Sequence, residues 1–113
     1  MAAELSLEAL REEINKIDEV IVRLLDRRAR CAYAIGRLKH EQGLQIYEPA
    51  REAAVMAHVR KVNGELDGPL DGDAVARLYE RIMDEARRIQ RIEAERDSSP
   101  AATEEVLPED EDG

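Results

Sequence analysis

The sequence predicts an all-α fold made of three helices, one long and two shorter. Two observations indicate it. Apolar residues recur at intervals of three and four over long stretches, which is the spacing that places them on one face of a helix. The hydrophobic side chains are mainly Leu, Ile, Val and Ala, while aromatic residues make up only 3% and are all tyrosine. The 113 residues suffice for one domain but not for two.

The long helix is predicted over residues 7–42. Ser6 is a suitable N-cap, Gly43 is a suitable residue to end the helix, and no proline interrupts the segment. At about 1.5 Å per residue such a helix is roughly 50 Å long. A compact domain of about 100 residues has a radius of gyration of only about 13 Å. A partner chain is therefore expected to cover the part of this helix that projects.

Two shorter helices follow. The first of them is predicted over residues 48–64, because Pro49 suits the first helical position. Residues 63–72 (NGELDGPLDG) have the composition of a turn. The last helix is predicted to begin after this turn with Asp73 as its cap, and its apolar stripe continues to Gln90.

Charge is distributed unevenly along the chain. The formal net charge is −9, but residues 97–113 hold seven acidic residues and no basic one. Residues 1–96, the predicted helical domain, therefore contain 19 acidic and 17 basic residues. The acidic tail, which also contains Ser, Pro and Ala, is predicted to be disordered. No basic patch typical of nucleic-acid binding is evident, so nucleic acid is not an expected partner.

Several absent features favour a cytoplasmic protein without a metal or cofactor. The first residues lack the basic and apolar regions of a signal peptide, and no run of about 18 apolar residues could span a membrane. Cys31 is the only cysteine, so no disulfide can form within the chain. Neither His40 nor His58 belongs to a group with metal-ligand spacing, and no glycine-rich phosphate loop is present.

Two cations interrupt the apolar stripe of the long helix. Arg28 occupies a position in a heptad series of isoleucines, and Lys39 lies about three turns further along the same face. Ala32 and Gly36 between them are small, which leaves room for a small anion. Buried cations are costly unless they are paired, so a structural ion-pair network with acidic residues is the competing interpretation. Their long side chains can also reach solvent at the edge of the helix.

Arg11 lies at the border of the same stripe, 17 residues before Arg28. This corresponds to about 25 Å along the helix, which no small molecule spans. An antiparallel partner chain would bring its own Arg11 beside Arg28, so that a site would be shared between two chains. The simpler alternative is a solvated charge on the helix surface.

Four polar residues of the shorter helices complete the candidate set. Glu48 and Glu52 lie one turn apart with Arg51 beside them, and such a group can fix a hydroxyl and orient a cation. Gln90 continues the apolar face of the last helix. The alternatives are the ordinary placement of charges at a helix end and a polar residue where a helix frays.

Five segments, in order, resemble the all-helical (AroQ-type, type II) chorismate mutases. They are residues 10–18 (LREEINKID), 24–28, 35–39, 47–52 (YEPARE) and 82–90, and the match extends over roughly residues 7–92. The resemblance implies an intertwined homodimer with two shared active sites. It also implies the rearrangement of chorismate to prephenate, the branch step toward phenylalanine and tyrosine. This reaction requires no metal or cofactor.

The resemblance also implies a role for each candidate residue. Arg28 and Arg11 of the partner subunit would hold the two substrate carboxylates. Lys39 and Gln90 would form hydrogen bonds to the ether oxygen of the breaking bond. Glu52, helped by Glu48, would hold the ring hydroxyl, and Arg51 would support this network.

Two residues depart from the family pattern. Ala86 stands where members of the family can carry a serine that contacts the ring carboxylate, and Glu48 stands where an aspartate can occur. Three other functions remain open: an isochorismate–pyruvate lyase with the same fold, a helical dimerisation module without activity, and a weak mutase that needs a partner enzyme of the same pathway.

Overall fold

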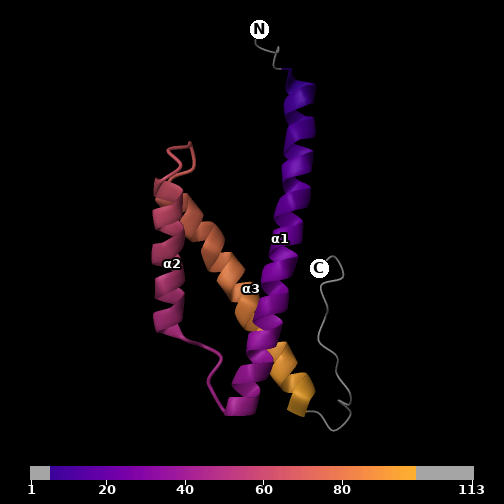
Figure 1. The fold of residues 1–113 in the computed structure, drawn as a ribbon, viewed down its shortest axis with the longest axis vertical. Helices are drawn as coiled ribbons and strands as arrows, with labels where there is room; N and C mark the ends of the chain where they lie inside the picture. The colour runs from indigo at the N-terminus through magenta and orange to yellow at the C-terminus, as the bar shows by residue number, and fades with distance from the viewer. Residues whose placement is uncertain (1–5, 99–113) are drawn as a thin grey trace.

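The computed structural model describes residues 6–98, which form three α-helices. Helix α1 spans Leu7–Gln42, α2 spans Pro49–Gly64 and α3 spans Gly72–Ser98 (Figure 1). No strand occurs in this part of the chain, so the predicted all-α class is confirmed. The predicted bounds of the long helix agree with those of α1.

Local hydrogen bonds at both ends define α1 as the sequence predicts. Ser6 has an extended backbone, and its hydroxyl oxygen accepts a hydrogen bond from the backbone N–H of Ala9 at 3.0 Å. Gly43 has a φ of +69°, in the left-handed region that glycine adopts most readily. The N–H of Leu44 donates to the carbonyl oxygen of Lys39 at 2.8 Å, which satisfies one of the last carbonyl groups of the helix.

The start of α3 differs from the prediction in one respect. Its cap is Asp71 and not Asp73, because the helix begins at Gly72, two residues before the start that a cap at Asp73 implies. Asp71 Oδ1 accepts a hydrogen bond from the backbone N–H of Ala74 at 2.8 Å. Asp73 lies in the first turn, where its carboxylate forms an ion pair with Arg60 of α2 at 3.1 Å. The two acidic residues are two positions apart, and the composition of the turn offers no means to choose between them.

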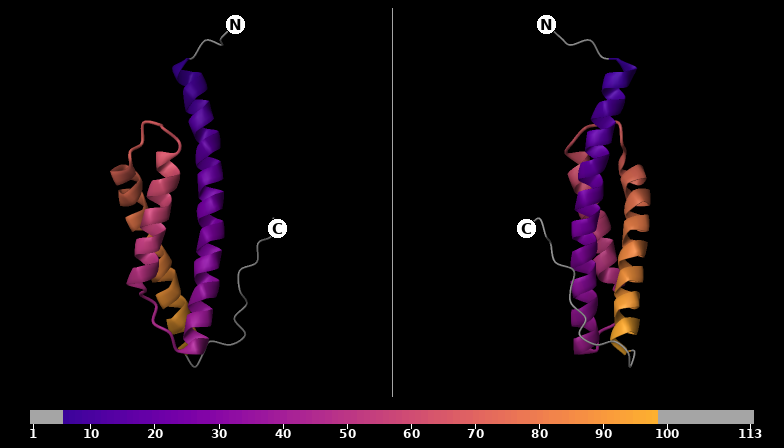
Figure 2. Two further views of the ribbon diagram at one scale, coloured as in Figure 1. Left: turned by 60° about the vertical axis from the view of Figure 1, so that its left-hand side comes forward. Right: turned by 90° about the vertical axis from the view of Figure 1, so that its right-hand side faces the viewer.

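Helix α3 holds the molecule together. It packs against the C-terminal half of α1 and against α2, whereas α1 and α2 do not pack on each other within residues 6–98 (Figures 1 and 2). The chain is elongated, with extents of 64 × 31 × 20 Å and a radius of gyration of 18.3 Å. A compact domain of this length has a radius of gyration of about 13 Å. The buried apolar side chains are correspondingly few: Ala32, Val75, Ala76 and Met83.

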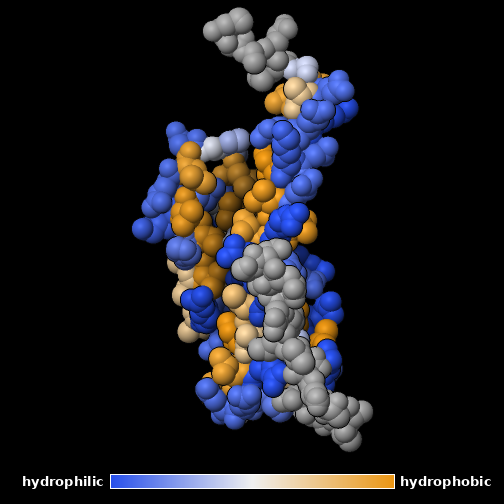
Figure 3. All heavy atoms as spheres, turned by 45° about the vertical axis from the view of Figure 1, so that its right-hand side comes forward, coloured by the Kyte–Doolittle hydropathy of each residue, from blue (hydrophilic) through white to orange (hydrophobic). Residues whose placement is uncertain are grey.

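The N-terminal half of α1 stands apart from the other two helices, and its first turns project beyond them (Figure 2). Its apolar side chains are between 41% and 64% exposed, and Figure 3 shows hydrophobic residues lining the hollow between this half and the other helices. The exposed apolar residues of this stripe are Leu7, Leu10, Ile14, Ile17, Val20, Ile21, Leu24 and Leu25. An apolar face of this size is unusual on a monomeric protein and is typical of an interaction site.

Two expectations concern the ends of the chain and the membrane. Helix α3 continues through Asp97 to Ser98, two residues beyond the predicted end of the domain. The rest of the predicted disordered tail lies outside the described residues. Across residues 6–98, none of the helices combines the length and the apolar character needed to span a bilayer.

Candidate active site

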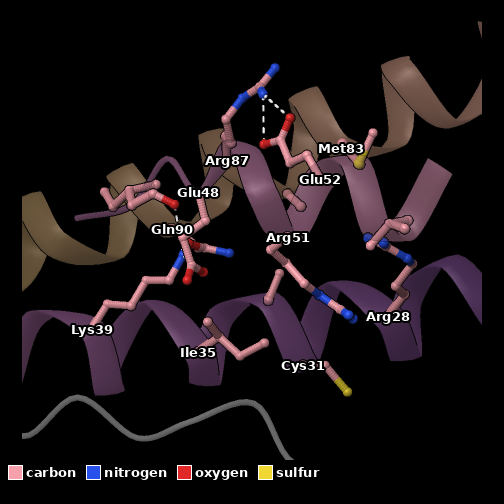
Figure 4. A pocket seen from close by; sticks show the side chains of 14 residues that line it. Arg28, Cys31, Ile35, Lys39, Glu48, Arg51, Glu52, Met83, Arg87 and Gln90 are labelled. Atoms are coloured by element: carbon pink, nitrogen blue, oxygen red, sulfur yellow. Dashed lines mark hydrogen bonds and ion pairs between the residues drawn. The ribbon is translucent and has the colours of Figure 1, made fainter. Parts of the chain in front are cut away.

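A cavity of about 330 Å³ lies between the C-terminal half of α1, helix α2 and helix α3 (Figure 4). Its size is that of a small-ligand site. Six of the seven residues predicted as site residues line it, and the seventh, Arg11, does not. Apolar side chains from all three helices fill the spaces between the charged groups. The charged lining residues are Arg28, Lys39, Glu48, Arg51, Glu52 and Arg87.

The position of α3 in the site depends on Gly36. A Cβ atom at this position would lie 3.0 Å from the Cα atom of Gln90, so the absence of a side chain allows α3 to approach α1 closely. The prediction that Gly36 leaves room for an anion is therefore wrong, because the backbone of α3 occupies that space. Ala32, the other small residue, does line the cavity.

Lys39 is buried, with 7% of its surface exposed, and its ammonium group is surrounded by acceptors. Its Nζ atom lies 2.6 Å from the carbonyl oxygen of Ile46, 3.0 Å from Oε1 of Gln90 and 2.9 Å from Oε1 of Glu48. Ile46 and Gln90 accept hydrogen bonds from two of its three donors, and Glu48 forms an ion pair with it. The buried charge is thereby compensated and held at one position.

Gln90 is the second buried polar residue of the site, with 8% of its surface exposed. Because its Oε1 atom accepts from Lys39, the orientation of the amide is fixed and its NH₂ group remains a directed donor. The pair connects α1 to α3 over a sequence separation of 51 residues. Lys39 and Gln90 thus form one preorganised unit at one end of the cavity (Figure 4).

Arg28 and Arg51 differ from the other cations of the cavity. Within residues 6–98 neither forms an ion pair with a carboxylate. The guanidinium carbon of Arg28 lies 5.7 Å from the centre of the Tyr79 ring, a cation–π arrangement that orients the side chain. A structural ion-pair network therefore explains Lys39, but it leaves two arginines of the cavity without an ion-pair partner among the described residues.

Arg87 is a lining residue that the sequence analysis missed. Its Nη1 atom lies 2.7 Å from both carboxylate oxygens of Glu52, and its Nη2 atom contacts the carboxylate of Asp84. The hydrogen bonds to Glu52 raise the pKa of Arg87 above its ordinary value, against the opposing effect of burial. A signal was present in the sequence, because Met83, Arg87 and Gln90 follow the spacing i, i+4, i+7 of one helix face.

Arg11 stands apart from the cavity. It is exposed on the projecting half of α1, about 25 Å along the helix from Arg28. Both residues lie on the one continuous helix α1, so they do not meet within the described chain. Its proposed contribution to a shared site therefore depends on a second chain.

Known proteins resemble this chain over most of its three helices. Residues 10–91 match the family described as chorismate mutase type II. The structure of chorismate mutase (form II) from Thermus thermophilus is similar, with a TM-score of 0.70 and 32% identity over 75% of this chain and 93% of that one. The two chains thus share one fold over most of their length. The chain belongs to the type II chorismate mutase family.

Longer relatives carry the same region. A bifunctional chorismate mutase/prephenate dehydratase of Pseudomonas aeruginosa is 40% identical over 88 residues, covering 74% of this chain and 23% of that protein. A protein of the same description from Neisseria gonorrhoeae is 41% identical over 81 residues, covering 72% and 21%. The T-protein of Haemophilus influenzae is 33% identical over 81 residues, also covering 72% and 21%. The chain spans less than a quarter of the length of these relatives.

Proposed function

We propose that the cavity binds chorismate and catalyses its [3,3] rearrangement to prephenate. The observation that carries this proposal is that one small cavity contains two kinds of group. Arg28 and Arg51 form no ion pair with a described carboxylate, and Lys39 and Gln90 form a buried, preorganised unit. Membership of the type II chorismate mutase family supports it. The reaction is intramolecular and needs no nucleophile, so binding and electrostatics supply the whole rate enhancement.

The arginines have the chemistry to select the reactive conformer of the substrate. Chorismate carries two carboxylates, and a guanidinium binds a carboxylate through two parallel hydrogen bonds. Arg28 would hold one carboxylate, and Arg11 of the partner subunit would hold the other. Arg51 would support the network that Glu48 and Glu52 form at the ring hydroxyl. Gripping a flexible dianion at two points favours the compact, chair-like conformer in which the reacting atoms meet.

Lys39 and Gln90 would stabilise the transition state. Negative charge grows on the ether oxygen as its bond to carbon breaks, so donors that are already in place act more strongly on the transition state than on the substrate. Ile46, Gln90 and Glu48 surround the ammonium group of Lys39 in the free protein, so one of them has to move aside for the ether oxygen. Glu48 is the acceptor best able to do so, because its side chain is 53% exposed.

Glu52, with help from Glu48, would bind the ring hydroxyl. Both carboxylates reach the cavity from the start of α2, so a hydroxyl directed toward α2 would meet an acceptor. Ala86 also lines the cavity, and its methyl group offers no hydrogen bond to the ring carboxylate. That carboxylate therefore depends on the arginines alone.

The active form is proposed to be an intertwined homodimer. The exposed apolar residues of the projecting half of α1 need a cover, and a second α1 running antiparallel would provide one with the same pattern. The same arrangement would bring Arg11 of each chain to the cavity of the other. A partner enzyme of the same pathway is a further possibility, since relatives join chorismate mutase to prephenate dehydratase in one chain.

The test is an assay of the purified protein with chorismate, following both its loss and the formation of prephenate. We expect conversion by the wild-type protein and at least about a hundredfold lower kcat/KM for Arg28→Ala. Release of pyruvate from isochorismate without conversion of chorismate would instead indicate a lyase. No reaction with either compound, by a dimer that also fails to bind a dicarboxylate transition-state analogue, would leave a helical dimerisation module.

A further inference from the structure

Arg87 lies opposite Glu52 in the cavity, and the proposed function gives Arg87 no contact with the substrate. We propose that Arg87 is a positioning residue that fixes the Glu52 carboxylate for the ring hydroxyl of the substrate. This inference rests on the proposed function, because it assigns Glu52 to that hydroxyl. It extends that function in two ways. Arg87 is added as a residue that acts through Glu52, and the pair is assigned to a neutral hydroxyl of the substrate.

The contact between the two residues is close and symmetrical. A single nitrogen of Arg87, Nη1, lies 2.7 Å from Oε1 and 2.7 Å from Oε2 of Glu52, as the dashed lines in Figure 4 show. The two side chains are only 25% and 23% exposed. A pair that is largely shielded from water is screened less than the exposed ion pairs elsewhere on the helices. The carboxylate therefore has one strongly preferred orientation.

Arg87 is itself held from two other directions. Asp84, one turn earlier on α3, contacts its Nη2 atom, so the side chain is anchored on its own helix. The ring of Tyr47, in the connection between α1 and α2, lies 5.5 Å from its guanidinium carbon. Arg87 thus joins α3 to α2 and to the segment that leads into Glu48. A guanidinium fixed on three sides is a rigid support for the carboxylate.

The arrangement has a consequence for what Glu52 can bind. With its charge compensated by Arg87, the carboxylate repels a dianionic substrate less than a free carboxylate would. Each oxygen keeps a lone pair that can accept a hydrogen bond from a neutral hydroxyl. A free carboxylate would instead favour a positively charged group. Arg87 therefore adapts Glu52 to a hydroxyl-bearing dianion.

The test compares Arg87→Met with Arg88→Met in the chorismate assay. Arg88 is the neighbouring arginine, its side chain is 61% exposed, and it pairs with Glu85 of the same helix at 3.1 Å. We expect kcat/KM to fall about tenfold or more for Arg87→Met, because displacement of a positioned group by about 1 Å can cost up to 10²-fold. Arg88→Met is expected to stay within about twofold of the wild type.

A double-mutant cycle separates positioning from a merely structural role. If Arg87 acts through Glu52, adding Arg87→Met to a Glu52→Gln variant should change kcat/KM by less than about twofold. An effect of the same size in both backgrounds would overturn the inference. Arg87→Lys serves where Arg87→Met does not fold, and we expect it to recover only part of the activity, since an ammonium lacks the planar geometry of a guanidinium.

The outcomes for the two proposals are distinct. A wild-type protein that converts chorismate, together with an Arg87→Met variant that equals Arg88→Met, would refute the role of Arg87 and leave the proposed function intact. A wild-type dimer without activity would refute the proposed function and, with it, this inference.

Discussion

The two halves of α1 share one apolar periodicity but have different surroundings. The C-terminal half packs on α3, and its polar residues Arg28 and Lys39 face a cavity. Within residues 6–98 no helix packs against the N-terminal half, and its apolar side chains are about half exposed. Burial of apolar surface is the main driving force of folding and association. The exposed apolar side chains of the N-terminal half therefore indicate that a partner covers them. We therefore propose that the same pattern serves catalysis in the C-terminal half and assembly in the N-terminal half.

The largest effect is expected at Lys39, in the half that carries the site. Lys39→Ala should keep the helical fold, because water molecules can take the place of the ammonium group and donate hydrogen bonds to the acceptors around it. It should lower kcat by about 10²–10³, the cost of losing a preorganised donor at a developing negative charge. Circular dichroism and steady-state kinetics measure the two quantities. Turnover near that of the wild type in a folded variant would reject the role of Lys39.

A charge in the other half should instead disrupt assembly. Ile21→Glu places a carboxylate on the exposed apolar stripe of α1, and burying it in an interface without a partner is costly. We expect at least about a tenfold loss of dimer affinity, measured by sedimentation velocity, with a parallel loss of activity. Val22→Glu is the matched control, since this residue is 63% exposed and points about 100° away around the helix.

A dimer of unchanged affinity and activity in Ile21→Glu would contradict the assignment of this face to the interface. If Ile21→Glu and Val22→Glu weakened the dimer equally, the stripe would not be the contact surface either.

Gly36→Ala should act on the junction between α1 and α3. The added methyl group would lie 3.0 Å from the backbone of Gln90, so α3 must move away from α1. Overpacking of this kind costs about 1–3 kcal/mol of stability. Thermal unfolding should show a lower midpoint, and activity should fall because Gln90 no longer meets Lys39. An unchanged midpoint with full activity would show that the close approach is not needed.

The smallest effect is expected at Tyr79, which contacts Arg28 through its ring. Tyr79→Leu keeps an apolar side chain but removes the cation–π contact, worth about 0.5–1 kcal/mol at a partly exposed site. KM should therefore rise about two- to fivefold while kcat changes little. A change confined to kcat would mean that Tyr79 acts on the chemical step and not on the orientation of Arg28.

The fold was largely predictable because its signals are local. The spacing of apolar residues, the N-cap at Ser6 and the glycine at position 43 each act within a few residues, and the structure agrees with all three. The cap of α3 was assigned to the wrong aspartate, since Asp71 and Asp73 lie in the same kind of turn. Local composition does not distinguish between two such neighbours.

The site was predictable only in part because its contacts are not local. Polar residues on apolar stripes identified Lys39 and Gln90, which the structure brings within 3.0 Å of each other. The pairing of Glu52 with Arg87 spans 35 residues and two helices, so the position of Arg87 on its helix face could not identify Glu52 as its partner. The space beside Gly36 was misjudged because a small residue can mark close packing as well as a cavity.

The central claim is that the N-terminal half of α1 in one chain completes the cavity beside the C-terminal half of α1 in the other chain. Mixing two inactive variants tests this claim most directly. Arg11→Ala lacks a residue given to the partner, and Lys39→Ala lacks a residue of the chain's own cavity. If dimers exchange subunits at random, half are mixed and each mixed dimer has one intact site, so about one quarter of the wild-type activity should return. Recovery near this level is predicted. If mixing under conditions of proven subunit exchange restores no activity, Arg11 does not serve the partner's cavity and the account is wrong.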